Sequence, residues 1–156
     1  MVKQRKGESW RRSVTRTTLK RPAIPMKKRT FLEPAYVILE QPDLIRYAAA
    51  SGDYNPIHYD REAARAAGLP GVVVHGMLNM ALLAEYLGPW VEDGYRVEEF
   101  HVRFRSFVRP GTKLAIAGTV QSETDDEVKI ALQITAEGAP HAAVTGEALL
   151  RRDHPE

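Results

Sequence analysis

Cysteine is absent from this chain of 156 residues. Disulfide bonds, thiolate metal sites and a cysteine nucleophile are therefore all excluded. Long apolar runs are missing too, because the most apolar stretch, Met77–Leu87, is too short to span a bilayer. No basic segment leads into an apolar one in the manner of a signal peptide, so we expect a cytoplasmic location. With 44% hydrophobic and 27% charged residues, the composition is that of a globular domain.

Several familiar site motifs are also missing. The glycines do not gather into a nucleotide-binding loop, and Ser51 does not lie in a GxSxG elbow. Asp53, His58 and His75 are candidate metal ligands, but their spacing matches no HExxH or similar pattern. We therefore expect no metal and no resident cofactor.

Positive charge is concentrated at the start of the chain. Residues 1–30 hold eleven Lys or Arg and one acid, Glu8, a balance of +10, and since the whole chain carries +2 the remainder carries −8. We expect a flexible extension, either a solvated arm or sequence upstream of a true start at Met26. The alternative is contact with an anionic membrane surface, an acidic carrier protein or nucleic acid. Nucleic acid is the least favoured, because Trp10 is the only aromatic residue in this segment.

Residues 31–67 predict one strand and two helices. Apolar residues around Tyr36 predict a short strand that begins near Pro34. A helix opens at Pro42 and ends at Gly52, a typical C-terminal cap residue. Asp60 is the expected N-cap of a second, short helix.

A third helix, Met77–Leu87, is interrupted only by Asn79 and Glu85. A helix that is apolar on nearly every side is expected to be buried on nearly every side. Gly88-Pro89 should end its regular part.

From residue 100 onwards, apolar and polar residues alternate with a period of two. The apolar positions are Phe100, Val102 and Phe104; Leu114, Ile116 and Val120; Val128, Ile130, Leu132 and Ile134; and Ala142, Val144, Ala148 and Leu150. Turn residues separate these runs, so they predict four antiparallel strands with one apolar face each. With the strand near residue 36, the pattern predicts an α+β domain whose sheet of about five strands wraps around the third helix.

The loop Ser51–His58 carries the candidate chemistry. Asp53 and His58 flank Asn55-Pro56, and Pro56 keeps Asn55 out of the α region, so both side chains lie on a rigid bend. We expect this loop to be partly buried. A neutral imidazole can accept a proton from a water that a carboxylate orients, as the addition of water to an α,β-unsaturated thioester requires. The alternative is structural: Asp bracing a turn and His filling the core.

The start of the third helix adds a second element. The first N–H groups of a helix lack intrahelical acceptors and carry partial positive charge, so they can hold an enolate oxygen. Gly76 has no side chain, so its amide can approach a substrate closely.

These residues resemble a known family. Tyr47, the run Ser51–His58 and Ala64 are similar to the signature of the MaoC-like, hydratase-2 group of hot-dog-fold (R)-specific enoyl-CoA hydratases and dehydratases. His75-Gly76-Met77 resembles the start of that family's central helix, and Val102–Arg105 with Arg109-Pro110-Gly111 resembles its first long strand and turn. Ala50 departs from the pattern, which we interpret as a packing difference.

The resemblance implies a single hot-dog domain over residues 31–152, preceded by the extension 1–30. It implies a hydro-lyase that interconverts trans-2-enoyl and (R)-3-hydroxyacyl thioesters of coenzyme A or an acyl carrier protein. Asp53 and His58 would be the catalytic pair. The implied oxyanion and substrate-binding residues are Gly76, Asn55, His75 and Tyr54.

The resemblance also implies a partner subunit. Such subunits usually pair with their sheets edge to edge, so we expect a homodimer or a higher homo-oligomer, with a hetero-dimer as the alternative. Two other functions stay open: a non-catalytic or hetero-dimer-dependent acyl-binding subunit, and a hot-dog thioesterase. Arg103, Arg105 and Arg109 either meet phosphates of the thioester carrier or form a solvated face, and we favour the solvated face.

Overall fold

The alternating segments form one sheet, as their period predicts. The computed structural model describes residues 32–153. Its strands are β1 (Ala35–Ile38), β2 (Tyr95–Phe104), β3 (Lys113–Glu123), β4 (Glu127–Ala136) and β5 (Val144–Arg152). They lie in the order β1-β3-β4-β5-β2, and every neighbouring pair is antiparallel. The predicted extension 1–30 falls outside the described residues, so its boundary stays a prediction.

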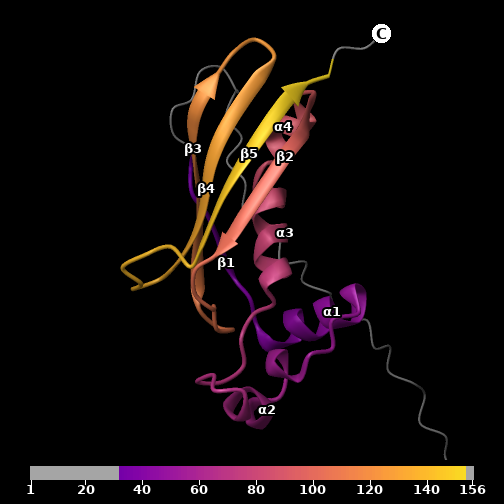
Figure 1. Cartoon of the computed structure of the whole chain (residues 1–156), viewed down its shortest axis with the longest axis vertical. Coiled ribbons are helices and arrows are strands. Elements are labelled where there is room, and N and C mark those ends of the chain that lie inside the picture. Colours follow the sequence, from indigo (N-terminus) through magenta and orange to yellow (C-terminus); the bar gives the residue numbers. More distant parts are fainter. Residues whose placement is uncertain (1–31, 154–156) are drawn as a thin grey trace, which may run out of the picture.

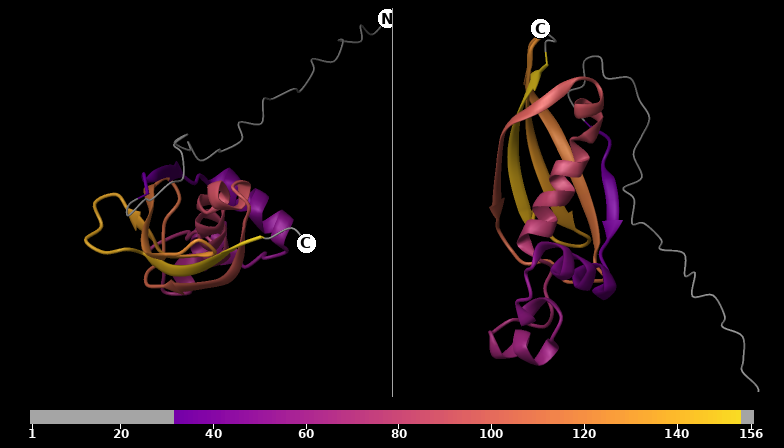
Figure 2. Two further views of the ribbon diagram at one scale, coloured as in Figure 1. Left: turned by 90° about the horizontal axis from the view of Figure 1, so that it is seen from above. Right: turned by 90° about the vertical axis from the view of Figure 1, so that its right-hand side faces the viewer.

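Five helices accompany the sheet in this part of the chain. They are α1 (Gln41–Ser51), the 3₁₀ helix η1 (Pro56–His58), α2 (Arg61–Ala66), α3 (Gly76–Tyr86) and α4 (Gly88–Glu92). Figure 2 shows α3 lying along one face of the curved sheet. In Figure 1, α1 and α2 gather at the end of the sheet where α3 begins. The predicted hot-dog arrangement, a five-stranded antiparallel sheet around a central helix, is confirmed.

The core lies between the sheet and α3. Ile116 of β3 pairs with Ile134 of β4, which pairs in turn with Val144 of β5, and all three are fully buried. Burial of each such side chain contributes about 1.5–3 kcal/mol. Across this interface Leu83 of α3 is also fully buried. The period-two alternation therefore identified the core-facing rows of β3, β4 and β5 correctly, but not that of β2, where the predicted inward residue Phe104 is 48% exposed.

Tyr86, at the C-terminal end of α3, contacts the sheet. Its hydroxyl donates a hydrogen bond to the Glu33 carbonyl oxygen at 2.9 Å, and burial raises the pKa of Tyr86 to about 12. The ring lies over Gly118 of β3, where a Cβ atom would come within 3.1 Å of it. A Cβ there would also come within 2.7 Å of the end of the Leu32 side chain, so any larger residue would force Leu32 to move.

The expectation that the third helix is buried on nearly every side is wrong. Leu82 and Leu83 face the sheet and are buried, but Met77 is 56% exposed, and Ala81 and Ala84 are exposed as well. One sheet face can cover only one side of a helix. Among residues 32–153, no helix combines the length and the apolar character needed to cross a membrane.

The structure differs from the sequence prediction in two places. β2 begins at Tyr95, five residues before the predicted Phe100. As an edge strand it is exposed over most of its length, so burial does not impose an alternating pattern there. The short helix α4 was not predicted, because Gly88-Pro89 is also a typical signal for the end of a helix. Proline is tolerated in the first turn of a helix, where its missing N–H has no partner to lose.

Candidate active site

The loop that joins α1 to α2 is shaped by its own side chains. Gly52 caps α1 with φ at 77°, a left-handed conformation that glycine adopts without strain. The Asp53 carboxylate accepts a hydrogen bond from the Asn55 N–H at 3.3 Å, and the Asn55 side chain accepts one from the Ile57 N–H at 3.3 Å. Asn55 is thereby the N-cap of η1, with Pro56 in the first turn. The loop is braced at each step between Asp53 and His58.

Asp53 and His58 face each other across a gap that one water can fill. His58 Nε2 lies 3.9 Å from Asp53 Oδ2, which is too long for a direct hydrogen bond. A water about 2.8 Å from each atom can bond to both. His58 Nδ1 lies 2.8 Å from the Val73 carbonyl oxygen, which can only accept, so Nδ1 carries the proton. In the neutral ring, Nε2 is therefore the free base on the Asp53 side.

His75 forms the inner wall of this site. Its ring stacks on His58 with centroids 3.8 Å apart and an interplanar angle of 22°. Its Nε2 donates to the Asp53 carbonyl oxygen at 3.3 Å, and Tyr47 packs against its other side at 4.8 Å. Only 1% of His75 is exposed. Burial first, and then the neighbouring His58, lower the pKa of His75, so this ring stays neutral.

The outer side of the site is more open than the sequence suggested. The Asp53 side chain is 46% exposed, whereas that of His58 is 9% exposed. Tyr54 is 61% exposed and its backbone carbonyl accepts a hydrogen bond from the Tyr59 hydroxyl at 2.9 Å. The expected partial burial thus applies to His58 and not to Asp53 or Tyr54. A single subunit leaves the carboxylate accessible from outside.

The start of α3 lies next to the same loop, because His75 is its N-cap residue. Gly76 follows directly, in an ordinary right-handed conformation. A Cβ atom at Gly76 would meet the ring of Phe104 at 3.5 Å, which is normal van der Waals contact. The fold therefore has room for a methyl group here, and glycine is not required for packing.

The three metal-ligand candidates do come together. One ligand atom each from Asp53, His58 and His75 lies within 4.8 Å of the others. The two imidazole rings stack with their planes 22° apart, so their in-plane lone pairs lie in nearly parallel planes. One nitrogen of each ring is bonded to a backbone carbonyl, which leaves Nε2 of His58 and Nδ1 of His75 free. The spacing of the three residues in the sequence matches no common ligand pattern, so the absence of a metal stays a prediction.

Comparison with protein families shows to which family the chain belongs. The model of the MaoC like domain matches residues 7–139. The chain belongs to the MaoC-like domain family. This agrees with the resemblance seen at Ser51–His58 and His75-Gly76-Met77, and it supports hydro-lyase activity for the MaoC-like domain in general terms.

Relatives of this MaoC-like chain include a protein named as a dehydratase and a subunit of fatty acid synthase. The 3-hydroxyacyl-thioester dehydratase X of Mycobacterium tuberculosis is 36% identical over 122 residues, 78% of this chain and 41% of the relative. The fatty acid synthase beta subunit TOXC of Cochliobolus carbonum is 34% identical over 104 residues, 65% of this chain and 5% of the relative. The chain therefore spans less than half the length of either relative.

Solved structures share the fold. The R-hydratase PhaJ1 from Pseudomonas aeruginosa has a TM-score of 0.66 and 27% identity, over 79% of this chain and 80% of that one. One chain of the ChsH1-ChsH2 complex from Mycobacterium tuberculosis has a TM-score of 0.71 at 17% identity, over 79% of this chain and 95% of that one. At such low identity the second comparison shows the fold alone.

Sequence reasoning missed the stacking of His75 on His58. The available signal was the isolated His75 in an otherwise apolar run of three valines and Met77.

The three arginines that the sequence offered as candidates for phosphate binding lie in two different places. Arg103 and Arg105 line a groove on β2, β4 and β5, whereas Arg109 lines a pocket beside α2.

Proposed function

We propose that this protein reversibly hydrates a trans-2-enoyl thioester to the (R)-3-hydroxyacyl thioester. The observation that carries the proposal is the geometry of one pair: Nε2 of His58, the ring nitrogen not bonded to Val73, lies 3.9 Å from the Asp53 carboxylate. The names of the relatives, dehydratase and hydratase, support the same reaction class. No cofactor is needed, because the reaction only adds the elements of water.

In the hydration direction, Asp53 orients a water and His58 Nε2 accepts its proton as the oxygen bonds to Cβ of the enoyl group. The C=C bond opens towards Cα, and the pair supplies the proton that ends on Cα. Negative charge develops on the thioester oxygen between these steps. The N–H groups at the start of α3, that of Gly76 first, stabilise this enolate oxygen. Dehydration runs the same steps in reverse.

The proposed enzyme acts as a pair of subunits. β2 is an edge strand, and Val97, Phe104 and Phe107 on or beside it are 41%, 48% and 54% exposed. The apolar side of α3 that carries Met77 is exposed as well. Exposed apolar surface next to a free strand edge is typical of a subunit interface. A second hot-dog subunit would cover this surface and enclose the site around Asp53.

The test is an absorbance assay with crotonyl-CoA and longer enoyl-CoAs on protein of measured oligomeric state. Asp53→Asn and His58→Ala should each lower kcat by about 10²–10⁴-fold, because general acid–base catalysis contributes this much. Circular dichroism must show an intact fold in both variants. Full activity in either variant would contradict the assignment of the pair.

A hetero-dimer is the second candidate, because one structural neighbour, the ChsH1-ChsH2 complex, is built from two different subunits; the exposed Asp53 side chain is compatible with either kind of pair. If the pure protein is inactive alone but active with a second hot-dog subunit, the functional unit is a hetero-dimer. Release of free thiol from acyl-CoA, without hydration, would show a thioesterase instead.

A further inference from the structure

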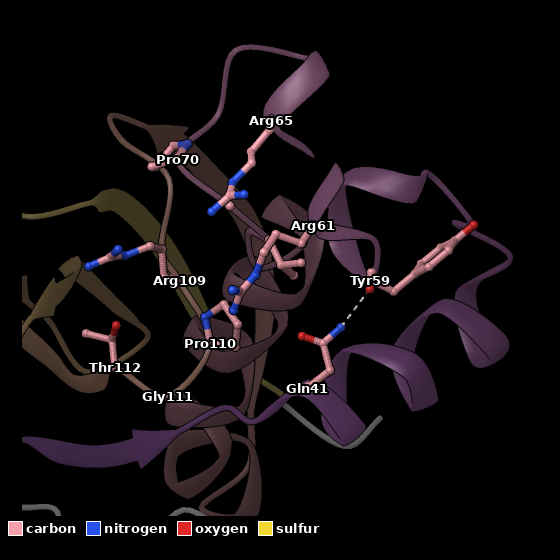
Figure 3. A pocket seen from close by; sticks show the side chains of 11 residues that line it. Gln41, Tyr59, Arg61, Arg65, Pro70, Arg109, Pro110, Gly111 and Thr112 are labelled. Atoms are coloured by element: carbon pink, nitrogen blue, oxygen red, sulfur yellow. Dashed lines mark hydrogen bonds between the residues drawn. The ribbon is translucent and has the colours of Figure 1, made fainter. Parts of the chain in front are cut away.

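A pocket open to solvent lies beside the catalytic loop, where Tyr59 and Val72 line it. Its volume of about 680 Å³ is within the range of small-molecule sites. Arg61 and Arg65 of α2 line it, together with Arg109 and the backbone around Gly111. Figure 3 shows the guanidinium groups of Arg61 and Arg65 reaching from α2 towards the turn 109–112, with Arg109 on the far rim.

The pocket is framed by segments that are hydrogen-bonded to one another. The Gly111 N–H donates to the Leu39 carbonyl oxygen at 2.8 Å, which ties the turn 109–112 to the start of α1. The Gln41 side chain donates to the Tyr59 carbonyl oxygen at 3.3 Å, which ties α1 to the chain just before α2. The Val74 N–H donates to the Val108 carbonyl oxygen at 2.8 Å. These bonds hold the walls in place without any ligand.

The pocket and the catalytic pair share a wall. Tyr59 and Val72 line the pocket, and their chain neighbours His58 and Val73 are joined by the 2.8 Å hydrogen bond to His58 Nδ1. A ligand in the pocket would therefore lie next to the two segments that hold His58 in place.

The arginines of this pocket are not neutralised. Arg61, Arg65 and Arg109 have no ion pair with a described carboxylate, and no acidic residue is among the described residues that line the pocket. Arg61 and Arg65 are four residues apart on one helix, an arrangement in which like charges repel. This occurs although residues 31–156 carry a net charge of −8. A multivalent anion would relieve the repulsion.

We propose that this pocket binds the phosphates of coenzyme A when the acyl-CoA thioester occupies the site. The inference rests on the proposed function, and it selects coenzyme A over a carrier protein. Guanidinium groups bind phosphate oxygens in pairs, with charge-assisted hydrogen bonds. A pocket of this volume suits a small, highly charged group, and the pantetheine arm separates such a group from the thioester carbon. A site beside the catalytic pair, and not within it, meets both requirements.

The test compares two crotonyl thioesters, one of coenzyme A and one of N-acetylcysteamine, which has no phosphate. Arg61→Gln and Arg65→Gln should each raise KM for crotonyl-CoA about tenfold and leave kcat unchanged, as expected for the loss of one charge-assisted contact. KM for the N-acetylcysteamine thioester should not change. Arg103→Gln is the matched control, because it removes the same charge from the groove on β2, β4 and β5.

Equilibrium binding separates this proposal from the proposed function. Isothermal titration of the full chain with coenzyme A should show about tenfold weaker binding in the Arg61 and Arg65 variants, even if the protein hydrates neither thioester. The inference is overturned if crotonyl-CoA kinetics and coenzyme A binding are the same in the variants as in the unchanged protein. It is also overturned if inorganic phosphate binds as tightly as coenzyme A, or if the variants impair only a carrier-protein thioester.

Discussion

At the scale of single residues, His75 has the most unusual surroundings. It is buried between Tyr47 and His58, donates to the Asp53 carbonyl oxygen, and leaves its Nδ1 without a hydrogen-bond partner in the described structure. Protonating this ring would place a charge in a buried site, next to His58. The neutral ring instead fixes the positions of both members of the catalytic pair.

The burial of His75 predicts a pH dependence of stability. Because the pKa of His75 is lowered in the folded protein from 6.5, the unfolded chain binds a proton more readily than the folded one. Its contribution is fully present above pH 6.5 and is lost as the pH falls from there towards the lowered folded value. Urea unfolding at pH 7.5 and 5.5 should show a smaller loss of stability in His75→Phe than in the unchanged protein. An equal loss in both would contradict this account.

At the scale of elements, the short helix η1 sets the spacing of the pair. Three backbone N–H groups of this loop each donate a hydrogen bond to the side chain two residues earlier. The N–H of Asp53 donates to Ser51, that of Asn55 to Asp53, and that of Ile57 to Asn55. The loop therefore holds its shape by local bonds and not by burial. Two hydrogen bonds are its main links to the rest of the fold. One joins His58 Nδ1 to the Val73 carbonyl oxygen, and the other runs from the Val73 N–H to the Ile57 carbonyl oxygen.

Removing the cap of η1 should disturb catalysis more than removing the cap of α2. Asn55→Ala should cost about 1 kcal/mol of stability and also lower kcat, because the spacing of Asp53 and His58 is no longer held. Asp60→Ala is the matched control, since Asp60 accepts from the Glu62 and Ala63 N–H groups at 2.8 and 3.1 Å and caps α2. It should lose similar stability and keep its kcat. Equal kcat losses in both variants would argue against the role of Asn55.

At the scale of the whole molecule, the sheet covers one side of α3 and leaves the other side exposed. The free edge at β2 and the exposed Met77, Phe104 and Phe107 together offer an apolar surface. An apolar helix with one side uncovered is stable in a subunit that pairs. Pairing would also reduce the exposure of Asp53, so assembly and catalysis should be linked.

A charge on the free edge should therefore break the assembly. Val97→Lys places an ammonium on β2, and light scattering should then give the mass of a single chain at micromolar concentration, with reduced hydration activity. Ile45→Lys is the control, because Ile45 is 53% exposed on α1, away from this edge. An unchanged mass for Val97→Lys would show that subunits pair elsewhere or not at all.

Local pattern was enough to predict much of this protein. Apolar residues at every second position between residues 113 and 150 predicted which side chains of β3, β4 and β5 face the core. The apolar run Met77–Leu87 predicted both ends of α3 to within one residue. Gly52, Asn55 and Pro56 specified a rigid bend between Asp53 and His58. These features follow from short-range sterics and hydrogen bonding, which depend only on neighbouring residues.

Only the tertiary structure decided which distant residues come together. His75 stacks on His58, the Val73 carbonyl oxygen accepts a hydrogen bond from His58 Nδ1, and Arg109 lines the same pocket as Arg61 and Arg65, although these residues are far apart in the chain. The exposed side of α3 likewise follows from the single sheet face available to it. Such contacts depend on strand order and on how the segments cross, and periodicity along the chain carries no information about either.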